Sequence, residues 1–348
     1  MHTEEEKYMK RCIQLAKNGQ NNVAPNPMVG AVIVCDGKII GEGYHIKYGT
    51  PHAEVNAINS VKDPSLLKRS TIYVSLEPCS HYGKTPPCAD LIIKMEIPRI
   101  VIGCQDPFAK VAGRGIQKLK EAGREVIIGI LEEECKDLNR RFITFNTLHR
   151  PYITLKWAES VDHLIDTDRT DGSPAKLSSP HTSMLVHKKR AENDAIFVGT
   201  RTAQLDNPSL TVRNWYGRNP LRVVIDKDLT LPESLNLFDQ STPTLVFTSK
   251  KKESIANLTY QTINFEEDIL PQILNRLYLL KIQSILVEGG SYLLQSFINA
   301  NLWDEIVVEE CPQKLISGVQ APTLDSKIKC KILHFFGRKI RHYHYDNL

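Results

Sequence analysis

The chain has 348 residues, a formal net charge of +4, 41% hydrophobic residues and 24% charged residues. A length well above about 150 residues suggests two domains, and this composition supplies enough apolar mass for two cores. The sequence has no dense basic block that would predict binding to nucleic acid or to a membrane surface. Its apolar runs are all shorter than the roughly 18 residues of a membrane span. The acidic amphipathic N-terminal segment is unlike a targeting peptide. Eight cysteines in a chain of this length do not predict a secreted disulfide framework. We therefore expect a cytoplasmic protein, and its net charge leaves small anionic substrates open.

The N-terminal part alternates helix and strand patterns, and Asp36-Gly37 between two apolar runs is a strong hairpin signal. Strands separated by helices of this length favour parallel pairing, so we predict an α/β/α layered domain. The predicted elements are a helix over 4–18, a hairpin over 31–45, a helix from His52, a strand over 71–79, a helix from Pro87-Cys88, a strand over 99–107, a helix over 115–123 and a strand over 125–131.

The pattern breaks around residues 146–151, and we place the domain boundary there, with one domain over 1–147 and a second over 148–348. The second part starts a new series of apolar strands and helices, so we predict a second α/β sheet with its own core. Its expected elements are strands over 152–160, 195–200, 221–226, 244–249, 284–290 and 305–310, with a helix over 183–193.

Three residues in the N-terminal part carry the donor atoms that zinc prefers: His52, Cys79 and Cys88. Three protein ligands leave a fourth tetrahedral position open for water, as in a catalytic site. Glu54 follows the histidine at the start of a predicted helix, where it can reach beside the metal without ligating it and can transfer protons. A histidine, a glutamate two residues later and a downstream Pro-Cys with a second cysteine are typical of zinc-dependent deaminases.

The pattern departs from that signature in one respect, because eight residues separate the two cysteines here instead of two. Isolated cysteines are often buried small hydrophobes, and a structural zinc site would need a fourth ligand, for which His81 or Cys104 is available. The coincidence of the three ligands, the strand-to-helix context of each and the position of Glu54 argue against both alternatives, and a structural site needs no acid beside its histidine. We therefore predict hydrolytic deamination of an exocyclic amine on a pyrimidine-type ring.

Several long runs resemble the bifunctional riboflavin-biosynthesis deaminase/reductase family. They are APNPMVGAVIV, GEGYHIKYGTPHAEVNA, VSLEPCSHYGKTPPC and GCQDPFAKVAGRGIQKLKEAG in the first part, and RAENDAIFVGTRTAQLDNPSLTVR, LRVVID and LVEGG in the second. The resemblance implies a cytidine-deaminase-like α/β/α domain followed by a dihydrofolate-reductase-like α/β domain. It implies zinc-dependent deamination of 2,5-diamino-6-(5-phosphoribosylamino)pyrimidin-4(3H)-one, then NADPH-dependent reduction to 5-amino-6-(5-phosphoribitylamino)uracil. We also expect a homo-oligomer.

The substrate of the first reaction needs hydrogen-bonding partners at the ring and cationic partners at the phosphate. Asn26, in a proline-stiffened loop, offers both a donor and an acceptor, and the other candidates lie in the family-like runs. The alternative for Asn and Asp before proline is a turn role that serves the backbone alone. The candidate substrate residues of the deaminase are Asn26, His45, Lys84 and Asp106.

The second part lacks a G-x-G-x-x-G fingerprint, but Gly289-Gly290-Ser291 ends a buried strand directly before a predicted helix. Such a turn lets the backbone approach a phosphate at a helix N-terminus, although the pattern also fits a plain tight turn. The resemblance implies cofactor contacts at Ala158, Lys176, Thr202, Asp206, Lys227, Gly290 and Ser291. It implies reductase substrate contacts at Pro174, Arg190, Leu210, Arg213 and Glu288, where arginine forks suit a phosphate.

The second part also departs from the family pattern. Lys176 stands where a tryptophan is common, Pro174 where a serine is common, and His163 where glycine is expected. A lysine can attract an anionic cofactor but cannot stack as an indole does. We consider Asp162 as a candidate acid for the reduction.

Three other interpretations compete. A nucleic-acid base deaminase would need a basic, aromatic-lined approach, whereas aromatic residues make up 7% of this chain. A zinc-stabilised binding module would have no use for Glu54. In the third interpretation the C-terminal half is an inactive oligomerisation domain, and binding of NADPH would discriminate against it.

Overall fold

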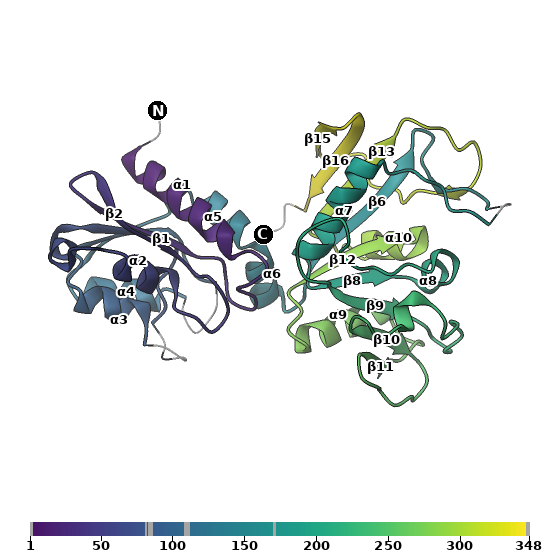
Figure 1. Ribbon diagram of the computed structural model, residues 1–348, viewed down its shortest axis with the longest axis horizontal. Coiled ribbons are helices and arrows are strands. Elements are labelled where there is room, and N and C mark those ends of the chain that lie inside the picture. The colour runs from purple at the N-terminus through teal and green to yellow at the C-terminus, as the bar shows by residue number, and fades with distance from the viewer. Residues whose placement is uncertain (1–2, 81, 83–85, 108–111, 170–171, 346–348) are drawn as a thin grey trace. The chain divides into compact units, whose positions relative to one another are not determined.

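The computed structural model describes residues 3–80, 82, 86–107, 112–169 and 172–345. The chain divides into two compact units, Met1–His149 and Arg150–Leu348 (Figure 1). This division falls after His149, whereas the sequence places it after residue 147. Within the described ranges, no helix is both long enough and apolar enough to cross a membrane.

In the described part of the N-terminal unit, five strands form one sheet in the order β2-β1-β3-β4-β5. Strands β3, β4 and β5 are parallel, as predicted, while β1 pairs antiparallel with both β2 and β3. The predicted hairpin joins β1 to β2 through Asp36 (φ 51°) and Gly37 (φ 73°), and positive φ at both positions is what a type I′ turn requires. The bounds are β1 Gly30–Cys35, β2 Lys38–Tyr44, β3 Thr71–Leu76, β4 Arg99–Cys104 and β5 Glu125–Ile128.

Helices cover both faces of this sheet, which gives the predicted α/β/α layers (Figure 1). Successive strand residues point to opposite faces. Ala31 and Ile33 of β1 therefore pack with α2, α3 and α4, whereas Val32 and Val34 pack with α1 and α5. The bounds are α1 Glu4–Ala16, α2 Ala53–Asn59, α3 Cys88–Lys94, α4 Arg114–Glu121 and α5 Glu132–Leu138, with short 3₁₀ turns η1 Lys17–Gly19 and η2 Pro64–Arg69.

The N-terminal unit ends in a helix that the sequence pattern does not reveal. Helix α6 (Arg140–Leu148) continues past residue 146, where we expected the break. It stops at His149, whose φ of 53° is left-handed, shortly before Pro151. A left-handed residue cannot continue a right-handed helix.

The C-terminal unit is built on a nine-stranded sheet in the order β11-β10-β9-β8-β12-β6-β13-β16-β15 in its described residues. The strands from β11 to β13 are parallel, and the β15–β16 hairpin is added antiparallel at the β13 edge. The bounds are β6 Tyr152–Ser160, β8 Ala195–Val198, β9 Leu221–Ile225, β10 Thr244–Thr248, β11 Leu258–Thr262, β12 Ser284–Gly289, β13 Glu305–Cys311, β15 Cys330–Phe335 and β16 Arg338–His344; β7 Leu164–Asp166 and β14 Val319–Gln320 form a separate pair.

Apolar side chains fill both faces of this sheet. Helices α9 (Ile269–Leu279) and α10 (Ser291–Asn299) pack Leu274 and Phe297 against one face. The second core, on the other side of β8, β9, β10 and β12, includes Ala203 of α8 (Thr200–Asp206) and residues around the turn η3 (Asn236–Phe238). Helix α7 (Pro180–Glu192) contacts β13 through a hydrogen bond of 2.6 Å from Thr182 Oγ1 to Glu309 Oε1.

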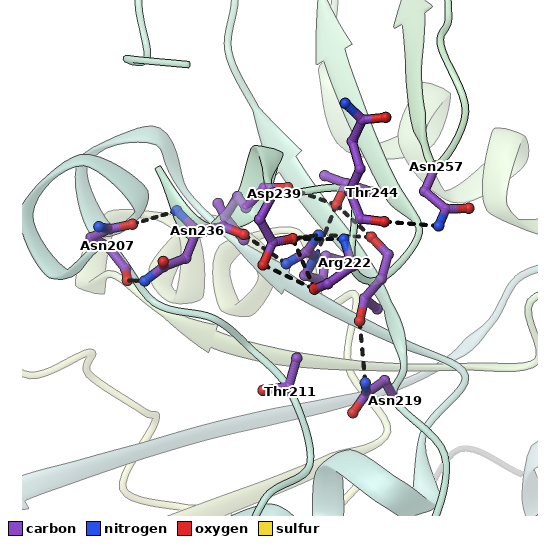
Figure 2. A network of polar contacts seen from close by, with 12 residues as sticks. Asn207, Thr211, Asn219, Arg222, Asn236, Asp239, Thr244 and Asn257 are labelled. Carbon is purple, nitrogen blue, oxygen red and sulfur yellow. Dashed lines mark hydrogen bonds and ion pairs between the residues drawn. The ribbon is translucent and has the colours of Figure 1, made fainter. Parts of the chain in front are cut away.

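A buried arginine connects the second core to the end of α8. Figure 2 shows the fully buried Arg222 of β9, whose guanidinium donates to the Asn236 and Thr242 carbonyls and to Asp239 Oδ1 at 2.7–2.8 Å. Asn236 in turn donates from its main-chain N to Asn207 Oδ1 at 2.7 Å and from Nδ2 to the Asn207 carbonyl at 2.8 Å. Asn207 directly follows α8, so this network fixes the position of that helix.

Candidate active sites

The three predicted metal ligands lie together where β3 ends and where α2 and α3 begin. His52 is the N-cap residue of α2, Cys88 is the first residue of α3, and Cys79 follows β3 after a Glu-Pro pair. His52 Nδ1 lies 3.6 Å from Cys79 Sγ and 3.4 Å from Cys88 Sγ. Their ligand atoms all lie within 4.8 Å of one another, and among the described residues no other group of His, Cys, Asp and Glu meets that criterion.

These separations fit a zinc ion. Bond lengths of about 2.0 Å to nitrogen and about 2.3 Å to sulfur at tetrahedral angles place the nitrogen and sulfur atoms about 3.5 Å apart. The observed separations of 3.4 and 3.6 Å match this value. The hydrogen bond from Cys88 and the one from His52 hold the pKa of Cys79 well below its usual range, so a thiolate is already favoured there.

Glu54 lies in the first turn of α2 and is only 3% exposed. Burial, with repulsion from Cys79, raises the pKa of Glu54 to about 7. A carboxyl group whose pKa lies near neutrality can both accept and donate a proton. A bound dication would lower this pKa by attraction, in the direction that favours the proton-accepting form.

Two of the predicted substrate residues meet beside this site. Asn26 Nδ2 lies 3.0 Å from His45 Nε2, and His45 Nδ1 lies 3.1 Å from the Pro51 carbonyl, which can only accept. The carbonyl therefore selects the Nδ1–H tautomer, so Nε2 accepts from Asn26. Burial also lowers the pKa of His45, whose ring centroid is 5.4 Å from that of His52.

The other two predicted substrate residues of the deaminase differ in how they can be placed. Asp106 is 7% exposed, and its main-chain N donates to Glu77 Oε2 at 3.3 Å. Glu77 lies two residues before Cys79 in the sequence. Lys84 lies outside the described residues.

The C-terminal unit contains a cleft of about 1790 Å³ at the carboxyl ends of β6, β8, β9 and β12. Ligands of parallel α/β sheets commonly bind at this edge. Eight of the residues predicted for the reductase line the cleft: Ala158, Pro174, Lys176, Thr202, Asp206, Glu288, Gly290 and Ser291.

At the base of the cleft, Glu288 accepts two hydrogen bonds from Arg190, from Nε at 3.0 Å and from Nη2 at 2.6 Å. Burial alone would raise the pKa of Glu288, but attraction to Arg190, the hydrogen bonds from Arg190 and the charges of Lys156 and His187 together outweigh burial and hold the pKa below its ordinary value. Lys156 also lines the cleft, and burial lowers the pKa of its ammonium. The sequence analysis missed Lys156. A lysine between Leu155 and Trp157 in the strand YITLKWAES is the signal that could have found it.

The glycine turn has the geometry that a phosphate contact requires. Gly289 has a φ of 137°, which disfavours any side chain, and Gly290 is the N-cap residue of α10. A Cβ at Gly290 would lie 3.0 Å from Thr202 Oγ1, so a side chain there would crowd the cleft. The first main-chain N–H groups of α10 lack intrahelical partners, which makes this end suitable for an anion.

Asp206 is paired within the protein. Its carboxylate forms an ion pair with Arg169, which also bonds Asp166 Oδ2 from Nε at 2.5 Å. The Nη1 atom of Arg169 is buried without a hydrogen-bond partner in the described structure, and Arg169 lines the cleft. Arg169 was not predicted, because Asp206 lies 37 residues away in the chain and the strand that carries Asp166, β7, is too short to leave a sequence pattern.

Four predicted contacts are not among the residues that line the cleft; one is Arg190, which pairs with Glu288, and the other three lie elsewhere. Leu210 is 2% exposed and packs in the second core, Arg213 is exposed and donates to Thr211 Oγ1 at 2.9 Å, and Lys227 Nζ lies 5.6 Å from the centroid of the Phe265 ring. Phe265 itself lines the cleft, which places Lys227 at its margin.

One of the departures from the family pattern, His163, has a conformational consequence in the structure. His163 has a φ of 59°, the conformation that favours glycine, and its Nδ1 lies 2.8 Å from Glu159 Oε1. Pro174 and Lys176 are exposed at the cleft wall.

The prediction that Asp162 is the acid of the reduction is wrong. Its carboxylate accepts hydrogen bonds from the main-chain N of Leu315 and Ile316, and hydrogen bonding, first to Ser160, lowers its pKa to about 2.

A Cys₂His site with a buried glutamate on an α/β/α domain, followed by an α/β domain with a ligand cleft, defines a zinc-dependent deaminase joined to a reductase. Residues 2–104 match the cytidine and deoxycytidylate deaminase zinc-binding region, and residues 151–334 match the RibD C-terminal domain. The riboflavin biosynthesis protein RibD of Bacillus amyloliquefaciens is 42% identical over 92% of this chain and 88% of its own, and that of Aquifex aeolicus is 40% identical over 90% and 88%.

Solved structures agree with these matches. The diaminohydroxyphosphoribosylaminopyrimidine deaminase/5-amino-6-(5-phosphoribosylamino)uracil reductase of Thermotoga maritima superposes with a TM-score of 0.88 at 36% identity, covering 98% of each chain. Acinetobacter baumannii RibD gives 0.87 at 31% identity with the same coverage. The chain belongs to the RibD family of riboflavin biosynthesis proteins. Its fold is a cytidine-deaminase-like domain followed by a RibD C-terminal α/β domain, and its cofactors are Zn²⁺ and NADPH.

Proposed function

We propose that this chain catalyses two successive reactions on one small-molecule substrate. Residues 1–147 would deaminate 2,5-diamino-6-(5-phosphoribosylamino)pyrimidin-4(3H)-one, and residues 148–348 would reduce the ribosyl side chain of the product to give 5-amino-6-(5-phosphoribitylamino)uracil. The single observation that carries the proposal is the buried Glu54 beside His52, Cys79 and Cys88. The same chain contains the cleft lined by Lys156 and by Glu288, which pairs with Arg190.

In the first reaction, water adds to the ring carbon that carries the amine, and ammonia leaves. Zinc, when held by His52, Cys79 and Cys88, supplies the Lewis acidity that makes water nucleophilic at neutral pH. Glu54 accepts the proton of the attacking water and returns it to the departing amine, so protons balance over the step. Asn26, oriented by its bond to His45, faces the substrate as a hydrogen-bonding group of fixed geometry.

In the second reaction, the bond between the ribosyl C1 and the oxygen of the ribose ring breaks; a hydride adds to C1, and a proton adds to that oxygen to give a hydroxyl group. NADPH supplies the hydride. When NADPH is bound, the N-terminus of α10 with Gly290 and Ser291 would hold a phosphate, and Thr202 and Lys176, which line the same cleft, would contact the cofactor. Burial lowers the pKa of Lys156, and Lys156 donates the proton to the oxygen of the ribose ring. Glu288 accepts a hydrogen bond from a substrate hydroxyl, and Arg190 fixes the position of the Glu288 carboxylate.

We further propose that the protein is cytoplasmic and assembles with a second copy of itself. The support for assembly is the edge strand β15, which carries the exposed side chains Ile332, Leu333 and Phe335, with Phe336 beside it. An exposed apolar sheet edge is a ready surface for pairing.

The two half-reactions can be tested separately. The diaminopyrimidine substrate without NADPH should release ammonia, and a chelator should abolish this release. With the deaminated substrate, the protein should oxidise NADPH even in the presence of the same chelator. The same assay with NADH serves as the comparison. Ammonia release that survives removal of zinc, or no oxidation of either cofactor, would refute the corresponding half of the proposal.

A further inference from the structure

A second buried carboxylate lies beside the metal site and has no part in the chemistry described so far. Glu77 is 4% exposed and stands between the end of β3 and Pro78-Cys79. Its Oε1 accepts main-chain N–H groups from Gly115 at 2.9 Å and Ile116 at 3.3 Å. Its Oε2 accepts those of Gly113 at 2.9 Å and Asp106 at 3.3 Å.

These four donors come from two places that the chain must bring together. Three belong to the start of α4, and the fourth belongs to Asp106, just after β4. The carboxylate thus completes the hydrogen bonding of the first turn of α4 and of the strand end at once.

The packing around Glu77 is as close as the backbone allows. A Cβ at Gly115 would lie 2.0 Å from the carbonyl oxygen of Pro78, and Gly113 has a φ of 76°. Both positions therefore require glycine. The start of α4 rests directly on the residue that precedes the metal ligand Cys79.

Helix capping alone does not require this arrangement. A neutral Ser, Thr or Asn caps a helix N-terminus well, whereas burying an ionised carboxylate is costly unless every lone pair is used. An ionised carboxylate offers acceptors in two directions, so one rigid group can hold Asp106 and α4 at a fixed distance from Cys79.

We propose that Glu77 is a positioning residue of the deaminase, which fixes Asp106 relative to the metal site so that the pyrimidine substrate meets a preformed pocket. This inference rests on the proposed deamination and on the proposed substrate contact of Asp106. Glu77 itself does not touch the substrate; it acts through the main chain of the Asp106 strand end.

Glu77→Gln in the full-length protein tests this role. Glutamine keeps the shape, but its amide nitrogen would face two main-chain N–H donors in either orientation, so two of the four amides lose their acceptor. We expect the KM of deamination to rise by about tenfold or more, with a smaller change in kcat. Losses of this size are typical when a residue that orients a binding group is replaced. Zinc content and NADPH oxidation with the deaminated substrate should stay unchanged. Hydrogen exchange at the Gly113 and Gly115 amides should accelerate.

Two further variants make the result decisive. Glu121→Gln is the matched control, because Glu121 is an exposed carboxylate at the other end of α4 that accepts from Gln117 Nε2 at 2.8 Å. Asp106→Asn closes a double-mutant cycle, in which the two KM effects should be strongly non-additive if Glu77 acts through Asp106. If Glu77→Gln loses zinc, Glu77→Asp replaces it, since it keeps the charge and shortens the reach.

An unchanged KM in the Glu77 variant, or additive effects with Asp106→Asn, would overturn the inference and leave Glu77 as a helix cap. A parent protein that releases no ammonia would instead refute the proposed function.

Discussion

Glu54 should be required for deamination and, in the metal-free protein, should destabilise the fold. The perturbation is Glu54→Gln, which keeps the shape of the side chain but can no longer accept a proton. General acid–base assistance is commonly worth about 10²–10⁴ in rate. This factor corresponds to about 3–5 kcal/mol of transition-state stabilisation, and zinc should still bind through His52, Cys79 and Cys88.

The stability effect follows from the burial of this carboxyl group. Burial raises the pKa of Glu54 from 4.5 to about 7 in the folded protein, whereas the unfolded chain keeps the ordinary value. Between these pH values the unfolded chain has released its proton and the folded protein has not, so stability falls as the pH rises. Each tenfold change in protonation equilibrium is worth about 1.4 kcal/mol, so the full penalty is about 3 kcal/mol above pH 7.

The assay compares parent and Glu54→Gln by ammonia release and by urea unfolding of the zinc-free proteins between pH 5 and pH 8. All three tryptophans, Trp157, Trp215 and Trp303, lie in the C-terminal unit, so circular dichroism or calorimetry must report on the N-terminal one. The stability advantage of the variant should grow by roughly 3 kcal/mol as the pH is raised. Ammonia release within about threefold of the parent would remove Glu54 from the mechanism. A pH-independent stability difference would refute the reasoning from burial.

Three further changes have distinct expected results. Cys88→Ala should lose most of its zinc by metal analysis and lose ammonia release, while NADPH binding persists; full zinc retention would contradict the ligand assignment. Lys156→Met should lower NADPH oxidation with the deaminated substrate by about 10² or more without affecting ammonia release, and an unchanged rate would exclude Lys156 as the proton donor. Arg222→Met leaves the Asn236 and Thr242 carbonyls and Asp239 without their buried donor, and should lower the free energy of unfolding of the C-terminal unit by about 3 kcal/mol or more. Tryptophan fluorescence measures this loss, and an unchanged unfolding midpoint would show that the network of Figure 2 adds nothing to stability.

The features that the sequence predicts best are those whose cause is local. The Asp36-Gly37 turn, the helix that begins after His52 and the strand over 152–160 are set by a few neighbouring residues, and the structure has each of them. The approach of His52, Cys79 and Cys88 was also predictable, because each lies at the end of an element and zinc restricts the geometry.

Features that depend on distant partners were not predictable from one sequence. Glu77 bonds main-chain N–H groups up to 39 residues away, and main-chain donors leave no mark in the sequence. The β15–β16 hairpin lacks the apolar alternation of a half-buried strand, since most of β15 is exposed. Helix α6 extends to Leu148, beyond the point at which the sequence pattern predicts a break. The helix ends because His149 adopts a left-handed conformation.

If one chain performs both deamination and reduction, ammonia and NADP⁺ must form in a fixed ratio, and the stoichiometry of these two products tests this. The purified zinc-loaded protein is given the diaminopyrimidine substrate with excess NADPH, and ammonia and NADP⁺ are quantified as the reaction runs to completion. We predict equal amounts of the two, with ammonia alone when NADPH is omitted. Ammonia release without NADPH oxidation in the complete mixture would contradict the account, because the C-terminal unit would then not act on the product of the N-terminal one.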